Sequence, residues 1–199
     1  MNKSFILLLV ALLVAVSADA AVDSRFDFDV LLDDRRIGAH SFHVARDADG
    51  THKVTSTAAF DVKFLGFVAY RYRHQATERW ARGCLTQISS TTDDNGSRHQ
   101  VTGPATTGCV VTYAYWDPQR LLQQHELLNP QTGAIDRVQF DAMGEESIMV
   151  RGAALRADRY RLRNGKLAID LWYSKAGEWL QLDSTTDTKR MLRYRLRER

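Results

Sequence analysis

Cysteine and proline are both scarce in this chain, which has 2 cysteines and 3 prolines among 199 residues. With so few prolines and a hydrophobic fraction of 44%, the composition excludes a disordered or low-complexity protein. Neither positive nor negative charge predominates, since the formal net charge at pH 7 is only +3. That excess is far below the charge of a typical nucleic-acid-binding domain, and we expect no nucleic-acid partner.

Familiar catalytic and metal-binding motifs are absent as well. The sequence has no G-x-S-x-G, no glycine-rich phosphate loop and no H-E-x-x-H. His40 and His43 are three residues apart, which sends them to opposite faces of a strand. The run 93–96 begins like a calcium loop but lacks the later ligands. We therefore predict no metal site, no cofactor and no enzymatic activity.

The N-terminus holds the longest apolar run. Lys3 precedes an apolar stretch over 5–16, and Ala18-Asp19-Ala20 is a small-x-small cleavage site. This pattern predicts a Sec signal peptide over residues 1–20, cut between Ala20 and Ala21. The alternative, a membrane anchor, needs about 20 apolar residues, more than this run has. We expect a periplasmic protein with a single β-rich domain over 21–199 and no transmembrane segment in the mature chain.

Export makes the two cysteines interpretable. Cys84 and Cys109 are an even count in an oxidising compartment, which predicts one disulfide. Closing that loop would stabilise the fold by about 3–4 kcal/mol in the chain-entropy model. The alternative, a redox or catalytic thiol, lacks a C-x-x-C motif.

Short alternating runs separated by Gly, Asn, Asp and Ser fill the rest of the chain and predict antiparallel strands. About ten strands with short turns predict an all-β fold, either a single strongly curved antiparallel meander sheet or an open or near-closed β-barrel. Gly66 interrupts the apolar run 62–69 as a bulge or bend would, and Asn95-Gly96 predicts a tight turn. A strand is expected over 110–116.

One short helix interrupts the strands. Asp117 is a suitable N-cap and Pro118 suits the first helical position, which predicts a helix to about Leu128. This helix would plug the concave side of the sheet.

A hairpin over 168–182 has the most distinctive pattern. A four-residue loop over 174–177 would pair Trp172 with Trp179 and place both tryptophans on one face beside Asp170 and Gln181. The opposite face would be plain core. Parity likewise places Tyr72, His74, Glu78 and Trp80 on one face of a second strand.

Aromatic side chains are the better candidates for function. They either line a ligand cavity or fill the core, and the sequence leaves both alternatives open. The candidate set is Tyr70, Tyr72, Trp80, Trp116, Trp172 and Trp179.

Charged residues offer two further hypotheses. Arginines on alternate positions would form either a basic convex surface for anionic lipid headgroups or polysaccharide, or a solvated outer face. They are Arg159, Arg161, Arg163, Arg193 and Arg195. Acid–base catalysis would need two converging carboxylates, and Glu78 and Asp170 are the ones among aromatics.

Several short motifs carry a family resemblance: Glu78-x-Trp80, Gly83-x-Leu85, Thr91-Thr92-x-x-Asn95-Gly96, Tyr115-Trp116, Asn129-Pro130-x-Thr132-Gly133, and 170–173 with Trp179. Through them the chain resembles an uncharacterised family of exported proteobacterial proteins with a domain-of-unknown-function label. The resemblance implies a β-rich periplasmic protein and transfers no catalytic residue. A more distant likeness is to the half-barrel lipoprotein carriers of the bacterial envelope, which hold acyl chains in a concave sheet.

The sequence thus predicts a periplasmic, non-catalytic β-sheet protein that binds an apolar or amphipathic, lipid-like ligand in a concave, aromatic-lined cavity. One alternative is an envelope scaffold or protein-interaction module with an envelope protein as its partner. The other is a hydrolase that uses Glu78 and Asp170.

Overall fold

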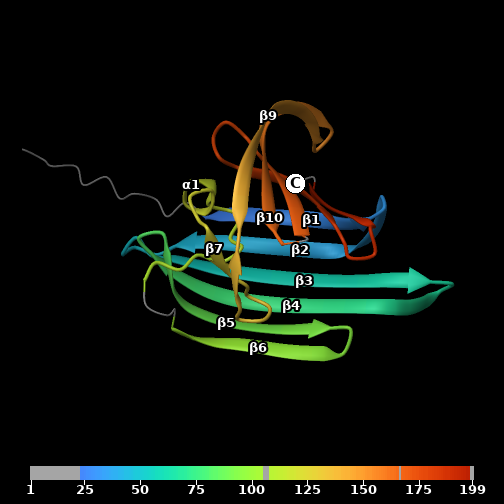
Figure 1. Cartoon of the computed structure of the whole chain (residues 1–199), viewed down its shortest axis with the longest axis horizontal. Helices are drawn as coiled ribbons and strands as arrows, with labels where there is room; N and C mark the ends of the chain where they lie inside the picture. Colours follow the sequence, from blue (N-terminus) through green and yellow to red (C-terminus); the bar gives the residue numbers. More distant parts are fainter. Residues whose placement is uncertain (1–22, 105–107, 166, 198–199) are drawn as a thin grey trace, which may run out of the picture.

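A computed structural model describes residues 23–104, 108–165 and 167–197 (Figure 1). The predicted signal peptide and its cleavage site lie outside the described residues. The strands are β1 Ser24–Leu32, β2 Arg35–Arg46, β3 His52–Phe64, β4 Phe67–Ala81, β5 Cys84–Asp94, β6 Ser97–Pro104, β7 Glu126–Leu128, β8 Ile135–Arg137, β9 Gln139–Val150, β10 Ala153–Asn164, β11 Leu167–Tyr173, β12 Trp179–Thr185 and β13 Met191–Leu196.

Eleven strands form one antiparallel sheet in the order β6-β5-β4-β3-β2-β1-β13-β12-β11-β10-β9. Each half is a meander, and the first and last strands of the chain pair in the middle. The sheet is not closed, because β6 and β9 are its two edges. The prediction of a curved antiparallel sheet is therefore confirmed.

The sheet curls so that its two halves face one another. In Figure 1 the long strands β2 to β5 run side by side, and β9 and β10 cross in front of them. Because successive side chains of a strand point to opposite faces of the sheet, every second side chain lies on the inner, concave face. There Trp179 packs against Phe28 and Phe42, with ring centroids 4.3 and 5.2 Å apart.

The segment between β6 and β9 lies inside this curl, but it contains less helix than predicted. Helix α1 covers only Pro118–Leu121, with Asp117 accepting a hydrogen bond from the Arg120 N–H as its N-cap. Residues 126–128 form β7, because the Leu128 N–H donates to the Val111 carbonyl and β7 pairs with β8. The predicted strand over 110–116 makes only isolated bridges. In both places, the helix that is shorter than predicted and the strand that is reduced to bridges, hydrogen bonds to other parts of the chain replace the predicted local structure.

The hairpin of β11 and β12 differs from the predicted register. Trp172 pairs with Gln181 and Tyr173 with Trp179, so Leu180 is an extra residue in a β-bulge. The bulge turns Trp179 to the inner face, while Trp172 stays on the outer face. The prediction that both tryptophans share a face is wrong for this reason.

Gly66 also has a different role from the one predicted. It forms a tight turn with Leu65 that joins β3 to β4, and Phe64 pairs directly with Phe67. The Asn95-Gly96 turn is confirmed, with positive φ at both residues. The disulfide is confirmed too: Cys84 and Cys109 are bonded, with their Cα atoms 5.0 Å apart.

Candidate functional site

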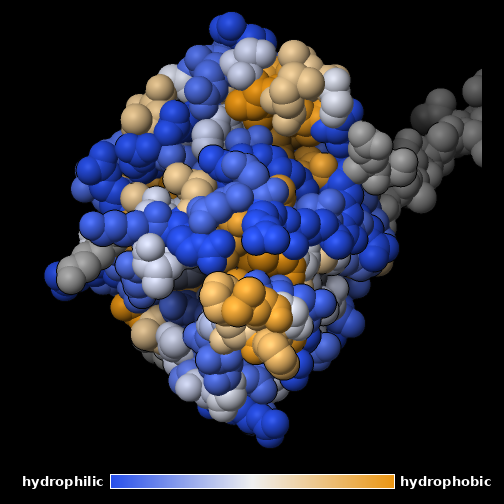
Figure 2. Space-filling view, turned by 90° about the vertical axis from the view of Figure 1, so that its right-hand side faces the viewer, coloured by the Kyte–Doolittle hydropathy of each residue, from blue (hydrophilic) through white to orange (hydrophobic). Residues whose placement is uncertain are grey.

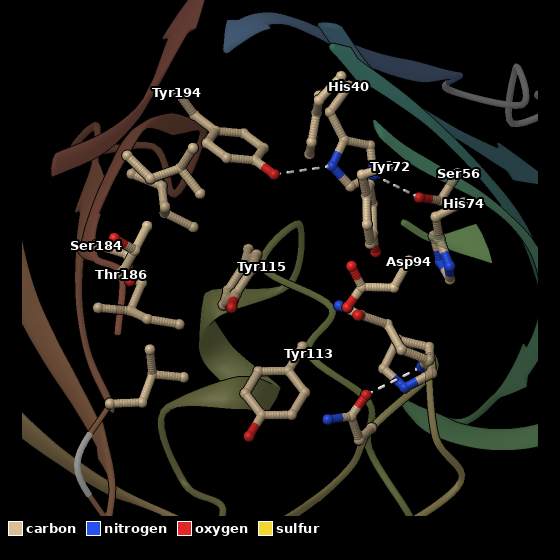
Figure 3. A pocket seen from close by; sticks show the side chains of 18 of the residues that line it. His40, Ser56, Tyr72, His74, Asp94, Tyr113, Tyr115, Ser184, Thr186 and Tyr194 are labelled. Carbon is tan, nitrogen blue, oxygen red and sulfur yellow. Dashed lines mark hydrogen bonds between the residues drawn. The ribbon is translucent and has the colours of Figure 1, made fainter. Parts of the chain in front are cut away.

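The curl of the sheet encloses a cavity of about 820 Å³ (Figure 3). Its walls are inner-face residues of β2, β3 and β4 on one side and of β12 and β13 on the other, with residues 112–116 between them. A volume of this size is within the range of small-molecule sites, about 300–1,000 Å³. The cavity is therefore the principal candidate for a ligand site.

The structure divides the predicted aromatic set. Tyr70, Tyr72, Trp116 and Trp179 line the cavity. Trp80 lies in the core, and its indole N–H donates to Glu78 Oε2 over 2.9 Å. Trp172 lies on the outer face of β11, where the Arg159 guanidinium covers its ring at 5.2 Å.

Two histidines, the half-buried His40 and the buried His74, form hydrogen bonds in the cavity wall (Figure 3). His40 Nε2 lies 2.7 Å from Ser56 Oγ, and His40 Nδ1 lies 3.3 Å from the Tyr194 hydroxyl. His74 Nδ1 lies 2.8 Å from Thr92 Oγ1. Burial lowers the pKa of His40 to about 3, with a smaller contribution from the nearby His74, and burial lowers the pKa of His74 to about 4. Both rings are neutral at pH 7.

Sequence reasoning missed His40, Tyr113, Tyr115 and Tyr194 as cavity residues. A signal for His40 existed, because it alternates with Phe42 on one face of its strand. Tyr194 had the same signal, because it alternates with Leu192 and Leu196 on one face of its strand. Tyr113 and Tyr115 had none, because they belong to the irregular inner segment.

The two acidic residues of the hydrolase hypothesis do not converge. Glu78 lies on the inner face, where it accepts hydrogen bonds from Trp80 and from the Thr112 hydroxyl. Burial raises its pKa to about 7, although the two hydrogen bonds oppose the shift. Asp170 lies on the outer face and pairs with Arg159 and Arg161 at 2.7 Å. Because the sheet separates them, Glu78 and Asp170 form no common acid–base site.

The predicted arginine surface is largely neutralised by neighbouring carboxylates. Arg159 and Arg161 pair with Asp170, Arg163 with Asp141, Arg193 with Asp34 and Asp183, and Arg195 with Asp183. An anionic partner would therefore meet little net positive charge there. Contact between these arginines and an anionic surface stays a prediction.

Across 23–104, 108–165 and 167–197 no group of three or more His, Cys, Asp or Glu side chains is arranged to hold a metal ion. No helix in the same ranges has the length and apolar character needed to cross a bilayer.

Comparison with known protein families identifies the family of this chain. The family model for DUF6134, a domain of unknown function, matches residues 28–197. The chain belongs to the DUF6134 family. The resemblance to an uncharacterised β-rich family is thereby confirmed.

A solved structure similar to this DUF6134 chain is a β-barrel-like protein of the domain of unknown function DUF1849 from Brucella abortus. The two share 9% sequence identity with a TM-score of 0.56, over 89% of this chain and 96% of the other. At that identity the likeness shows the fold alone. No curated protein matches the sequence.

Proposed function

We propose that this DUF6134 protein is a non-catalytic carrier or receptor that holds an apolar or amphipathic ligand inside its curled sheet, in the periplasm. The observation that carries the proposal is the cavity of about 820 Å³, which has aromatic and aliphatic walls on both sides. The disulfide is compatible with an oxidising compartment.

Charge inside the cavity limits the ligand chemistry. Among the described lining residues, Arg190 is the one with a permanent positive charge, and it pairs with Asp33 at 2.7 Å. Both histidines are neutral at pH 7 because their pKa values are lowered by burial. A buried carboxylate or phosphate would have no free cation to pair with, which disfavours a charged group deep inside. The enclosed part of the ligand therefore carries no negative charge.

Filling the cavity tests the proposal. Ala76 lies on the inner face of β4 and lines the cavity, whereas its neighbour Gln75 lies on the exposed outer face. Ala76→Trp and Gln75→Trp add the same ring on opposite sides of one strand. We expect the parent and Gln75→Trp to bind a fluorescent acyl-chain probe and carry lipid in native mass spectrometry, and Ala76→Trp to lose both. A parent that takes up neither probe nor lipid, or an Ala76→Trp variant that binds the probe as the parent does, would refute the proposal.

A further inference from the structure

The hairpin of β3 and β4 projects beyond its neighbours. The last pair between β2 and β3 is Gly38 with Phe60, and the pairing of β4 with β5 stops at Tyr72 with Asp94. The Asn95 N–H still donates to the Arg71 carbonyl, so residues 61–70 are the ones whose backbone pairs only within the hairpin. Four residues beyond Phe60, at about 3.3 Å each, extend the strand by roughly 13 Å. Figure 1 shows this tip at the far right, beyond every other turn on that side.

The projecting tip is apolar. Phe64, Leu65 and Phe67 are 69%, 81% and 78% exposed, and Val68 beside them is 43% exposed. Figure 2, which faces this side of the molecule, shows an orange cluster at the front, set among blue residues. A contiguous apolar patch on a projecting turn marks an interaction site more often than a solvated surface.

The backbone at the tip favours a different residue from the one present. Leu65 has φ 48 and Gly66 has φ 85, the two positive values of a type I′ turn, which Asn-Gly fits best. The described residues include seven non-glycine residues with positive φ, and Leu65 alone among them is apolar. A branched apolar side chain in this conformation costs stability, so its presence points to a use outside the fold.

Positive charge is in excess around the tip. The carboxylates Asp33 and Asp61 at this end are paired with arginines. Lys63 in the tip, Arg35 at the start of β2 and Lys189 in the turn between β12 and β13 are exposed and have no carboxylate partner in the part of the chain that the structure describes. Against these three cations stands one exposed carboxylate in the same turn, Asp187, which has no arginine or lysine partner among the described residues. An apolar tip flanked by unpaired cations suits an interface of acyl chains and anionic headgroups.

We propose that the tip formed by residues 63–68 inserts into the surface of a bilayer that contains anionic lipids. The tip continues roughly 13 Å past its last pair with β2, and the boundary between headgroups and acyl chains lies about 5–10 Å deep. Val62 and Tyr70, at the base of the tip, line the cavity, and so do the exposed Thr185 at the end of β12 and Thr188 in the turn that follows. Insertion would bring this open end of the cavity to the membrane. The inference goes beyond the proposed ligand binding and does not require it.

Vesicle co-sedimentation of the mature protein tests the inference. One set of vesicles contains equal parts of phosphatidylcholine and phosphatidylglycerol, and the other contains phosphatidylcholine alone. We expect the parent to bind the anionic set and to bind less as salt is raised. Leu65→Asn should weaken binding about tenfold or more, because the leucine side chain would no longer be buried among acyl chains and the lost binding free energy corresponds to at least about tenfold in affinity. Lys63→Ser should weaken it about fivefold.

Leu65→Asn also separates a functional role from a structural one. Because asparagine suits the turn, this variant should unfold at the same or a higher temperature than the parent while binding vesicles less. Met149→Ser is the matched control, since Met149 is 61% exposed and lies near the turn between β9 and β10, at the opposite end of the strands. Its binding should equal that of the parent.

Three results would overturn the inference. One is a parent that stays in the supernatant with both vesicle sets. Another is a Leu65→Asn variant that binds as tightly as the parent. The third is a parent that binds no vesicles and instead forms a dimer that Leu65→Asn abolishes in analytical ultracentrifugation, since the tip would then meet a second copy of the chain. Probe uptake without vesicles, with Ala76→Trp as its control, reports on the cavity alone, so failure of one proposal is distinguishable from failure of the other.

Discussion

Replacing Glu78 by glutamine should make the protein more stable at neutral pH and leave its stability in acid unchanged. Glu78 is only 7% exposed, and burial raises its pKa from 4.5 to about 7. Its Oε2 accepts the hydrogen bonds from Trp80 and Thr112. A glutamine amide oxygen can accept both bonds, so the variant resembles the protonated acid at every pH.

The size of the effect follows from the shift in pKa. Each unit corresponds to about 1.4 kcal/mol, so ionised Glu78 lowers the free energy of unfolding by about 3 kcal/mol. A raised carboxyl pKa means that the folded state holds its proton longer than the unfolded state. The associated stability is therefore complete below pH 4.5 and is lost as the pH rises to about 7.

Urea denaturation of the parent and Glu78→Gln across this pH range measures the effect. The difference in unfolding free energy should be near zero at about pH 4 and reach about 3 kcal/mol in favour of the variant at about pH 8. Contributions from the histidines cancel in the difference, because both proteins contain them. A difference that stays constant with pH would show that Glu78 has an ordinary pKa, and the account of this buried carboxyl would be wrong.

Three further predictions concern stability. Replacing Cys84 and Cys109 together by serine should lower the unfolding free energy by about 3–4 kcal/mol in urea denaturation, and labelling of both thiols in the native, oxidised parent would contradict the disulfide. Asp170→Asn should cost about 1–2 kcal/mol at neutral pH. Burial alone would raise the pKa of Asp170, but hydrogen bonds from arginines including Arg161 lower it overall, so this cost should shrink as the pH falls below 3.8; a cost independent of pH would argue against the pairing. Leu121→Ala should cost about 2–5 kcal/mol because Leu121 is fully buried in the inner segment, and a change below about 1 kcal/mol would show that the segment packs loosely.

Much of the fold was predictable because its signals are local. Alternation along β4 sorts Tyr72, His74 and Glu78 onto the buried face, as the structure confirms. The Asn95-Gly96 turn follows from the preference of both residues for positive φ. An even number of cysteines was enough to predict the disulfide.

Long-range pairing decided the rest. The hairpin of β11 and β12 could close in more than one register, and the observed one, with a bulge at Leu180, lets Trp179 pack against Phe28 and Phe42. That one extra residue moves Trp179 to the inner face and leaves Trp172 outside.

The sequence by itself determined the class of fold, because period-two alternation, turn residues and cysteine count depend on neighbours along the chain. Only the tertiary structure decided which residues form the cavity. The pairing of β1 with β13 brings His40 and Tyr194 together from distant parts of the chain, and no local pattern encodes that contact. The exposed tip at Leu65 likewise depends on where β2 and β5 stop pairing with β3 and β4, which is a property of the whole sheet.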